Sequence, residues 1–222
     1  FFAEEETMDT YATVVKFFQD SGVFIYPSIL VLALGLAIAI ERFIYISRAR
    51  NQNSKLWDEL TPLLKSGKLQ QVSQVVAKSD TAIGKIVNYG LGRLRTTRKR
   101  EEIDAAMEEG MIEVVPRLEK RTHYLATFAN VVTLLGLLGT IIGLIKAFTA
   151  VAVVNAAEKS ELLSASISIA MNNTAFGLMV AIPFLLIHAY LQARTSEVVD
   201  SLEAAKIKFL NMIERVKTDM GA

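Results

Sequence analysis

Two threonines and two asparagines that lie inside otherwise apolar stretches are the main candidates for chemistry in this sequence. Thr140 follows a Gly-Leu-Leu-Gly run, and Asn172, Asn173 and Thr174 form one short polar group. Hydroxyl and amide oxygens hydrogen-bond a carboxyl group or ligate a cation, but neither group titrates at physiological pH. Both apolar stretches lack Asp and Glu. The four residues therefore predict an ion path whose titrating group comes from another chain.

Small residues recur beside these polar positions at steps of three and four. Such stripes let helices approach closely in lipid, where apolar burial no longer drives association. We expect helix packing, and contacts between neighbouring chains, to use them. The alternative that the polar residues only pack helices stays open. The predicted packing residues are Gly136, Gly139, Gly143, Gly177 and Pro183.

Three long stretches hold most of the apolar residues, which make up 52% of the 222 positions. A helix rises about 1.5 Å per residue and the hydrocarbon core is about 30 Å thick, so about 20 residues span it. The sequence predicts transmembrane helices at 21–47, 122–148 and 162–193. A soluble protein with three wholly buried helices would need more amphipathic partners than this chain provides. A cleavable signal peptide would have a shorter apolar core than the first stretch, with small residues after it.

Charge around these helices predicts their orientation. The segment 48–121 carries 15 Lys/Arg against 10 Asp/Glu, whereas 1–20 is acidic. Because positive charge is retained in the cytoplasm, we expect a periplasmic segment at 1–20 and a cytoplasmic helical segment at 48–121. A periplasmic loop at 149–161 and a cytoplasmic helical tail at 194–222 follow. Since the chain opens with Phe1 rather than methionine, we expect a further segment before it.

Apolar residues recur at helical spacing in both cytoplasmic parts, which predicts that they pack as one helical bundle. The basic cluster between Arg93 and Arg100 lacks interleaved aromatic residues. This pattern favours a solvated face near lipid headgroups over nucleic-acid binding, and the net charge of +1 gives nucleic acid no support.

Glu41 and Arg42 end the first span, and we expect them to form an interfacial ion pair.

Enzymatic chemistry finds no support in the sequence. The chain has no cysteine, and its two histidines, His123 and His188, are far apart in the sequence. The glycines near Thr140 lie within an apolar helix with no preceding strand, so they form no phosphate-binding loop. We expect no enzyme, no cofactor and no resident metal.

Three stretches resemble the ExbB/TolQ/MotA ion-channel subunits of bacterial inner-membrane motors, and ExbB-like subunits most of all. Residues 125–143 resemble the second helix of the family, 174–183 the third, and Ile25-Tyr-Pro27 with Glu41-Arg42 the first. The resemblance implies that Thr140 and Thr174 line the pore. Ile169 stands where ExbB and TolQ proteins commonly have a glutamate, and Asn172 and Asn173 replace residues that are usually apolar or small.

The resemblance implies a homopentamer in the bacterial inner membrane, with its N-terminus periplasmic and its C-terminus cytoplasmic. The pentamer would enclose an ExbD/TolR-like single-span partner carrying a membrane aspartate. It would use the proton motive force to energise TonB-dependent outer-membrane transport through a TonB-like protein. A TolQ-like envelope motor or another stator is the alternative within this class, and a non-conducting scaffold is the alternative outside it. The differences from the family at Ile169, Asn172 and Asn173 allow sodium to be the conducted ion instead of the proton. Sodium would then bind at Thr140, Thr174 and Asn173.

Overall fold

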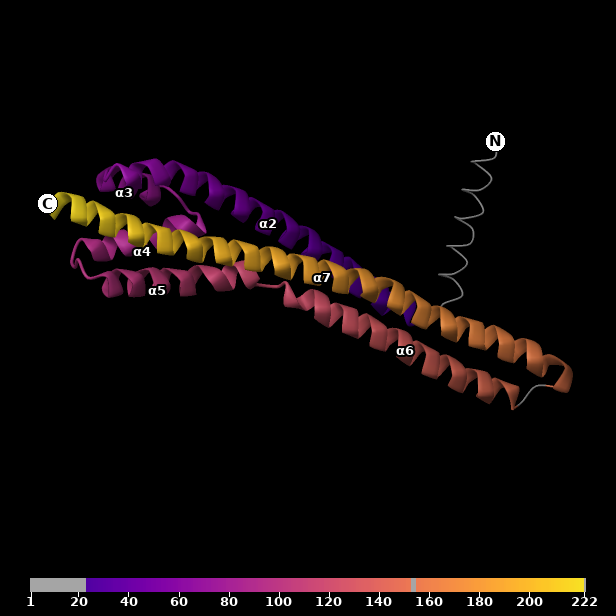
Figure 1. The fold of residues 1–222 in the computed structure, drawn as a ribbon. Coiled ribbons are helices and arrows are strands. Elements are labelled where there is room, and N and C mark those ends of the chain that lie inside the picture. The colour runs from indigo at the N-terminus through magenta and orange to yellow at the C-terminus, as the bar shows by residue number, and fades with distance from the viewer. Residues whose placement is uncertain (1–22, 153–154, 222) are drawn as a thin grey trace, which may run out of the picture. The chain divides into compact units, whose positions relative to one another are not determined.

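The computed structural model describes residues 23–152 and 155–221, and the regular secondary structure of that part is entirely helical. The predicted all-α fold class is therefore confirmed. The predicted segment 1–20 lies outside the described residues. The helices are α2 (Ile25–Lys65), α3 (Leu69–Ala77), α4 (Ala82–Leu94), α5 (Arg100–Glu119), α6 (His123–Val151) and α7 (Ala156–Gly221) (Figure 1).

The described residues contain three long apolar helical stretches, as predicted for a membrane protein. They lie within Ile25–Lys65, Arg100–Val151 and Glu158–Arg215, and each is long and apolar enough to cross a bilayer. Large apolar side chains are exposed on α6 and α7, which suits contact with lipid tails.

The helices do not end at the predicted segment boundaries. Helix α2 runs without interruption from the first predicted span to Lys65. Helix α7 continues from the third span into the tail, in agreement with the helical spacing of apolar residues there. The predicted loop 149–161 is largely helical, because α6 reaches Val151 and α7 begins at Ala156. A helix continues wherever its backbone hydrogen bonds do, so a change from apolar to polar residues need not end it.

The chain divides into two compact units, each with residues from both ends of the sequence. One comprises Ile40–Thr122 and Ala189–Ala222. It is the predicted helical bundle, with α3, α4 and α5 beside parts of α2 and α7. Helices α4 and α5 pack closely, because a Cβ added at Gly110 would lie 3.1 Å from Ile86 Cα. The largest fully buried side chains of this bundle include Leu60, Leu64, Ile86, Met107 and Phe209.

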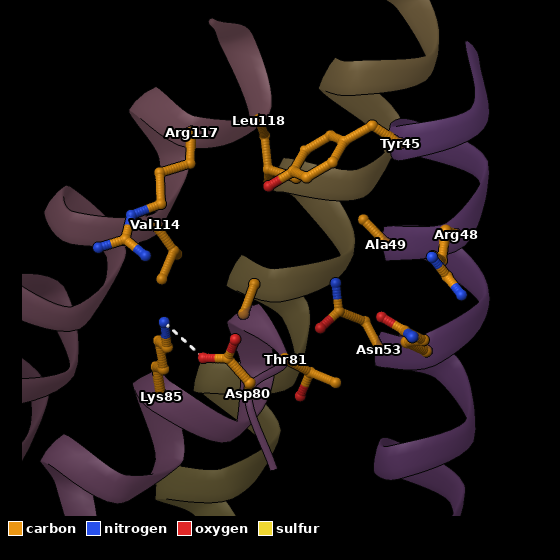
Figure 2. A pocket seen from close by; sticks show the side chains of 12 residues that line it. Tyr45, Arg48, Ala49, Asn53, Asp80, Thr81, Lys85, Val114, Arg117 and Leu118 are labelled. Carbon is orange, nitrogen blue, oxygen red and sulfur yellow. Dashed lines mark ion pairs between the residues drawn. The ribbon is translucent and has the colours of Figure 1, made fainter. Parts of the chain in front are cut away.

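A polar cavity lies inside this bundle, between α2, α4 and α5. Lys85 on α4 and Arg117 on α5 lie on one side of it, and Tyr45 on α2 lies on another (Figure 2). The ion pair between Lys85 Nζ and Asp80 Oδ1, 2.8 Å apart, lies at its edge.

The C-terminal end of the first predicted span makes ion pairs and hydrogen bonds that differ from the expected one. Glu41 pairs with Arg121, in the connection between α5 and α6, rather than with Arg42. Arg42 is buried, donates a hydrogen bond to the carbonyl of Leu118 and lies over the ring of Tyr45. The expected Glu41–Arg42 ion pair is wrong, because neighbouring residues on a helix point in different directions.

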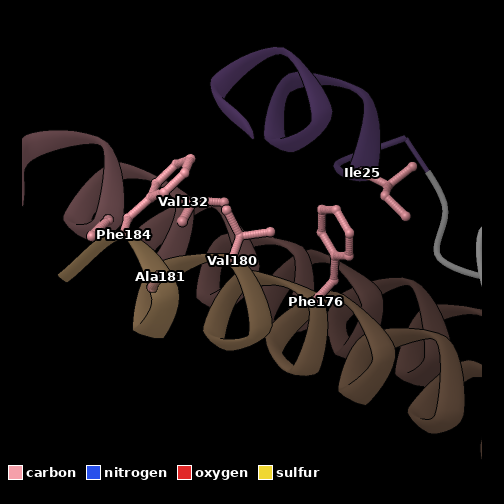
Figure 3. Packing of buried hydrophobic residues seen from close by; sticks show 7 residues of the cluster. Ile25, Val132, Phe176, Val180, Ala181 and Phe184 are labelled. Atoms are coloured by element: carbon pink, nitrogen blue, oxygen red, sulfur yellow. The ribbon is translucent and has the colours of Figure 1, made fainter. Parts of the chain in front are cut away.

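The other compact unit comprises Phe1–Ala39 and His123–His188. Its described part contains the start of α2, all of α6 and the first half of α7. The ring of Phe184 on α7 packs directly on Gly35 of α2, where any larger residue would collide with it. Figure 3 shows Phe176, Val180 and Phe184 along α7. The buried cluster is Ile25, Ala129, Val132, Phe176, Val180, Ala181 and Phe184.

Candidate ion-pathway site

The two threonines singled out in the sequence meet between α6 and α7. The Thr140 and Thr174 hydroxyl groups are within hydrogen-bonding distance of each other. Thr140 Oγ1 also lies 3.1 Å from the carbonyl oxygens of Gly136 and Ala170, and Thr174 Oγ1 lies 3.2 Å from the Gly136 carbonyl. Both threonines are half-buried. Their hydroxyls are thus held by several oxygen neighbours, in residues that keep part of their surface exposed.

Glycines allow this pairing by letting the two backbones approach. A Cβ added at Gly136 would lie 2.9 Å from the Asn173 carbonyl oxygen and 3.2 Å from Thr174 Cα. One added at Gly177 would lie 2.8 Å from the Val132 carbonyl oxygen. Backbone atoms cannot swing aside as side chains do, so these positions require glycine for the observed contact.

The two asparagines have different surroundings. Asn173 is buried, and its Nδ2 donates to the Ile169 carbonyl at 3.2 Å. Its side chain fills the space left by Gly139, where an added Cβ would come within 2.9 Å of Asn173 Cβ and Cγ. Asn172 is half-buried and has no hydrogen bond from its side chain within the described residues. The proposed sodium ligands Thr140 and Thr174 are therefore brought together, whereas Asn173 has a packing contact of its own.

The predicted packing stripe joins helices within one chain. A Cβ added at Gly143 would lie 2.9 Å from Ala170 Cβ, so this glycine also faces α7. The structure shows these glycines in contacts between α6 and α7 of one chain, and their contact with neighbouring chains stays a prediction. Pro183 is exposed on α7 and takes no part in that buried contact.

Titratable groups near the threonines are few. Helix α6 contains one charged residue, Lys146, which is exposed. No Asp or Glu occurs between Leu162 and Ala193. His188 is half-buried, and the described residues contain no cluster of His, Asp and Glu able to hold a metal ion. The helix pair thus offers hydroxyl and carbonyl oxygens without a proton-carrying side chain beside them.

The basic cluster of the bundle is engaged in contacts within the chain. Arg93 pairs with Glu102 at 2.7 Å, and Arg95 donates to Ser73 Oγ at 3.3 Å. Arg100 bonds Glu214, and its other nitrogen donates to Asn211 at 2.8 Å. These pairings agree with a solvated bundle face.

Backbone carbonyls are the part of the site that the sequence analysis missed. Gly136 lies four residues before Thr140, and Ala170 lies four before Thr174. A hydroxyl on a helix reaches the carbonyl four residues earlier, and a small residue there leaves that carbonyl open to the neighbouring helix. The repeated small-x-x-x-Thr pattern was the signal that could have identified these acceptors.

Comparison with known proteins gives a consistent result. The sequence matches the MotA/TolQ/ExbB proton channel family over residues 78–204, a region that includes both threonines. It is 25% identical over 203 residues to a biopolymer transport protein ExbB homolog of Methanothermobacter thermautotrophicus, covering 91% of this chain and 71% of that protein. It is 29% identical over 189 residues to ExbB-like protein 1 of Synechocystis, covering 84% and 74%. Biopolymer transport protein ExbB of Pseudomonas putida is 28% identical over 170 residues, covering 71% and 51%.

Proposed function

Because the chain belongs to the MotA/TolQ/ExbB proton channel family, we propose that it is the ion-conducting subunit of a motor in the bacterial inner membrane. The motor uses the proton motive force to drive an ExbD/TolR-like single-span partner that carries a membrane aspartate. Through a TonB-like protein, that partner energises transport across the outer membrane. The relatives called biopolymer transport proteins support this role.

The hydroxyl pair of Thr140 and Thr174 is the observation that carries the proposal. The Gly136 carbonyl lies within hydrogen-bonding distance of both hydroxyls. The Thr174 hydroxyl can therefore turn away towards a ligand while Thr140 still donates to that carbonyl, so the Gly136 acceptor keeps a partner. Half-burial of both threonines gives a ligand access to them.

A carboxyl group from the partner would complete the path. The hydroxyl of Thr174 can accept a hydrogen bond from the protonated carboxyl and donate one to the ionised carboxylate. Donation to the carboxylate stabilises the charged form, which lowers the barrier to releasing its proton in an apolar environment. The chain's own residues thus position the proton carrier, and the partner's aspartate carries the proton.

Substitution of Thr174 by valine tests this role. Thr174→Val keeps the shape of the side chain but removes the oxygen, so we expect assembly with the partner to persist and ion-driven activity to fall by at least about tenfold. Thr133→Val is a matched control, because Thr133 Oγ1 donates at 2.9 Å to the Ala129 carbonyl of its own helix. Proton uptake into vesicles measures conduction, and co-purification of the partner measures assembly.

A non-conducting scaffold is the second candidate, and the same hydroxyl contacts favour it. Hydroxyls that satisfy carbonyls across two helices stabilise packing without any ion. A scaffold predicts that Thr174→Val and Thr133→Val both retain full activity once folded. A conducting subunit predicts that Thr174→Val alone fails.

Assembly and orientation are further parts of the proposal. Five copies would surround the partner, with the N-terminus in the periplasm and the C-terminus in the cytoplasm. Exposed apolar residues on α6 support extensive contact with lipid or neighbouring subunits, and include Leu134, Leu137, Ile145 and Phe148. A TolQ-like envelope motor would use the same ion path, so exchange of the partner protein distinguishes the two roles.

A further inference from the structure

The cavity between α2, α4 and α5 has a composition that the channel function does not require. Its volume is about 210 Å³, smaller than the roughly 300 Å³ or more typical of sites for drug-sized ligands. Three basic side chains and one acidic side chain line it. We call it the basic cavity, and the lining residues that matter here are Tyr45, Arg48, Asn53, Asp80, Lys85 and Arg117.

We propose that the basic cavity binds a phosphate group. Arginine and lysine are the side chains that bind phosphate oxygens most strongly, and arginine can donate two parallel N–H bonds to them. Arg48 has no ion pair within the described part of the chain, so its guanidinium is available to an anion. Arg117 Nη2 contacts Glu113 Oε1 at 3.0 Å, which leaves the other nitrogens of this guanidinium as donors. Figure 2 shows Arg117 and Lys85 extending toward the same space.

Neutral donors add to these charges. Asn53 is 5% exposed, and its Oδ1 accepts the backbone N–H of Ile83 at 3.0 Å. Its Nδ2 has no hydrogen-bond partner in the part of the chain that the structure describes, although the residue lines the cavity. Tyr45, whose ring centroid lies 4.7 Å from the guanidinium carbon of Arg42, adds a hydroxyl to the lining. An amide donor without a partner and a phenolic hydroxyl are suited to an oxyanion.

Asp80 is the one acidic residue in the lining, and it opposes anion binding. Its hydrogen bond and ion pair with Lys85 hold the pKa of the Asp80 carboxyl below its usual value, so it stays ionised at neutral pH. The carboxylate neutralises part of the charge of Lys85. Removing the Asp80 charge should therefore strengthen phosphate binding.

Position along the chain favours a phospholipid as the source of the phosphate. Tyr45 lies in the last turn of the first predicted span, and Arg48 is the first residue after it. Basic residues at this depth on the cytoplasmic side meet the phosphates of anionic lipids. This choice of source rests on the proposed orientation, whereas phosphate binding itself does not. A soluble phosphate group would use the same donors.

Two kinds of binding measurement on the full chain test the proposal and separate the sources. Native mass spectrometry in micelles measures retention of phosphatidylglycerol against phosphatidylcholine, and calorimetry measures binding of inorganic phosphate. We expect selective retention of phosphatidylglycerol by the wild-type protein. Binding of inorganic phosphate instead would support the site with a soluble source. Absence of both would overturn the proposal.

Four variants make the test specific to the basic cavity. Arg48→Gln with Arg117→Gln should weaken binding by at least about tenfold, since each removes charged donors. Lys55→Gln with Lys120→Gln is the matched control, because it removes two charges near the same helices outside the cavity. Arg48→Lys with Arg117→Lys should retain most of the binding. Asp80→Asn should tighten binding, which a misfolded variant could not do. Equal weakening by the control pair, or weaker binding by Asp80→Asn, would contradict the proposal.

Discussion

Arg121 Nη1 lies 3.0 Å from Glu41 Oε1 and 2.9 Å from Glu41 Oε2, so the connection between α5 and α6 is tied to α2. Arg121 has a φ of 67°, a left-handed conformation that costs a non-glycine residue about 1–2 kcal/mol. The side chains of the pair are about half exposed, and an exposed ion pair contributes about 1 kcal/mol or less. The ion pair therefore offsets only part of the backbone cost.

The free energy of unfolding of Arg121 variants should depend more on the backbone conformation at this position than on the charge of the side chain. Arg121→Gly relieves the strained φ while it loses the ion pair, so we expect its free energy of unfolding to stay within about 1 kcal/mol of wild type. Arg121→Val adds a β-branched side chain at positive φ and should lose about 1–3 kcal/mol. Thermal unfolding in micelles, followed by circular dichroism, measures both. Glu41→Gln removes the ion pair alone and should cost about 1 kcal/mol or less. Equal stability of the glycine and valine variants would contradict this account.

Gly136 should tolerate no larger side chain, because its missing Cβ faces the backbone of α7. Gly136→Ala places a methyl group 2.9 Å from the Asn173 carbonyl oxygen and should destabilise the helix pair by about 1–3 kcal/mol. Gly92→Ala is the matched control, since no atom outside its own stretch lies within 4 Å of the added Cβ. Gly92→Ala should raise stability by roughly 0.5–1 kcal/mol, because alanine favours the helix. A similar loss in both variants, measured by thermal unfolding, would show that close packing at Gly136 is not the cause.

The three apolar helices were predictable because each spans more consecutive apolar residues than a soluble domain of this size can bury. The meeting of Thr140 with Thr174 followed in part from sequence, since both lie on stripes of small residues. Which of Asn172 and Asn173 is buried could not be predicted from the sequence. Adjacent helical residues point about 100° apart, and only the packing partner Gly139 determines which one is buried.

Long-range side-chain pairs were beyond the reach of the sequence. Glu41 has Arg42 beside it, yet it pairs with Arg121, which is 80 positions away. Adjacent side chains on a helix point in different directions, so they rarely pair with each other. The packing of the helices determines which distant residue becomes the ion-pair partner. The continuity of α2 through residue 47 was also missed. The apolar residues end there because the surroundings of the helix change, but the helix itself continues to Lys65.

Lys206 links α7 to α5 through two carboxylates. Its Nζ lies 2.6 Å from Glu108 Oε2 and 3.3 Å from Asp104 Oδ1. Burial disfavours the charged ammonium, but the hydrogen bonds and charges of Glu108 and Asp104 outweigh burial and raise the pKa of Lys206 above its ordinary 10.5. Because the folded state binds this proton more tightly, the stabilisation is fully present below about pH 10.5. It is lost as the pH rises through the higher pKa of the folded state.

Lys206→Met should therefore lower the free energy of unfolding at neutral pH by about 1 kcal/mol. The difference from wild type should shrink at strongly alkaline pH, where wild-type Lys206 loses its proton. Lys208→Met, which alters an exposed lysine of the same helix, should have little effect at any pH. Chemical unfolding across this pH range measures the differences. A deficit that stays constant to strongly alkaline pH would indicate lost packing rather than lost charge.

The proposed orientation can be tested with single cysteines, because the natural chain has none. Asp9→Cys and Lys159→Cys should react with an impermeant maleimide added from the periplasmic side. Arg98→Cys should react only after the membrane is permeabilised, since the segment with 15 basic residues is predicted to be cytoplasmic. Labelling in the reverse pattern would contradict the orientation and with it the cytoplasmic position of the basic cavity.

The identity of the ion follows from which oxygens are available at the threonine pair. Sodium prefers several oxygen ligands, and the Thr140 and Thr174 hydroxyls with a partner carboxylate could supply three. Asn173 would be the fourth, but it packs against Gly139 and bonds the Ile169 carbonyl. The Gly136 and Ala170 carbonyls lie beside the pair, but they already accept hydrogen bonds from the threonines. We therefore expect proton coupling, with full activity in sodium-free medium when the pH gradient is maintained. Asn173→Leu should then reduce stability while leaving the ion requirement unchanged. Loss of activity without sodium, restored by added sodium, would instead establish sodium as the coupling ion.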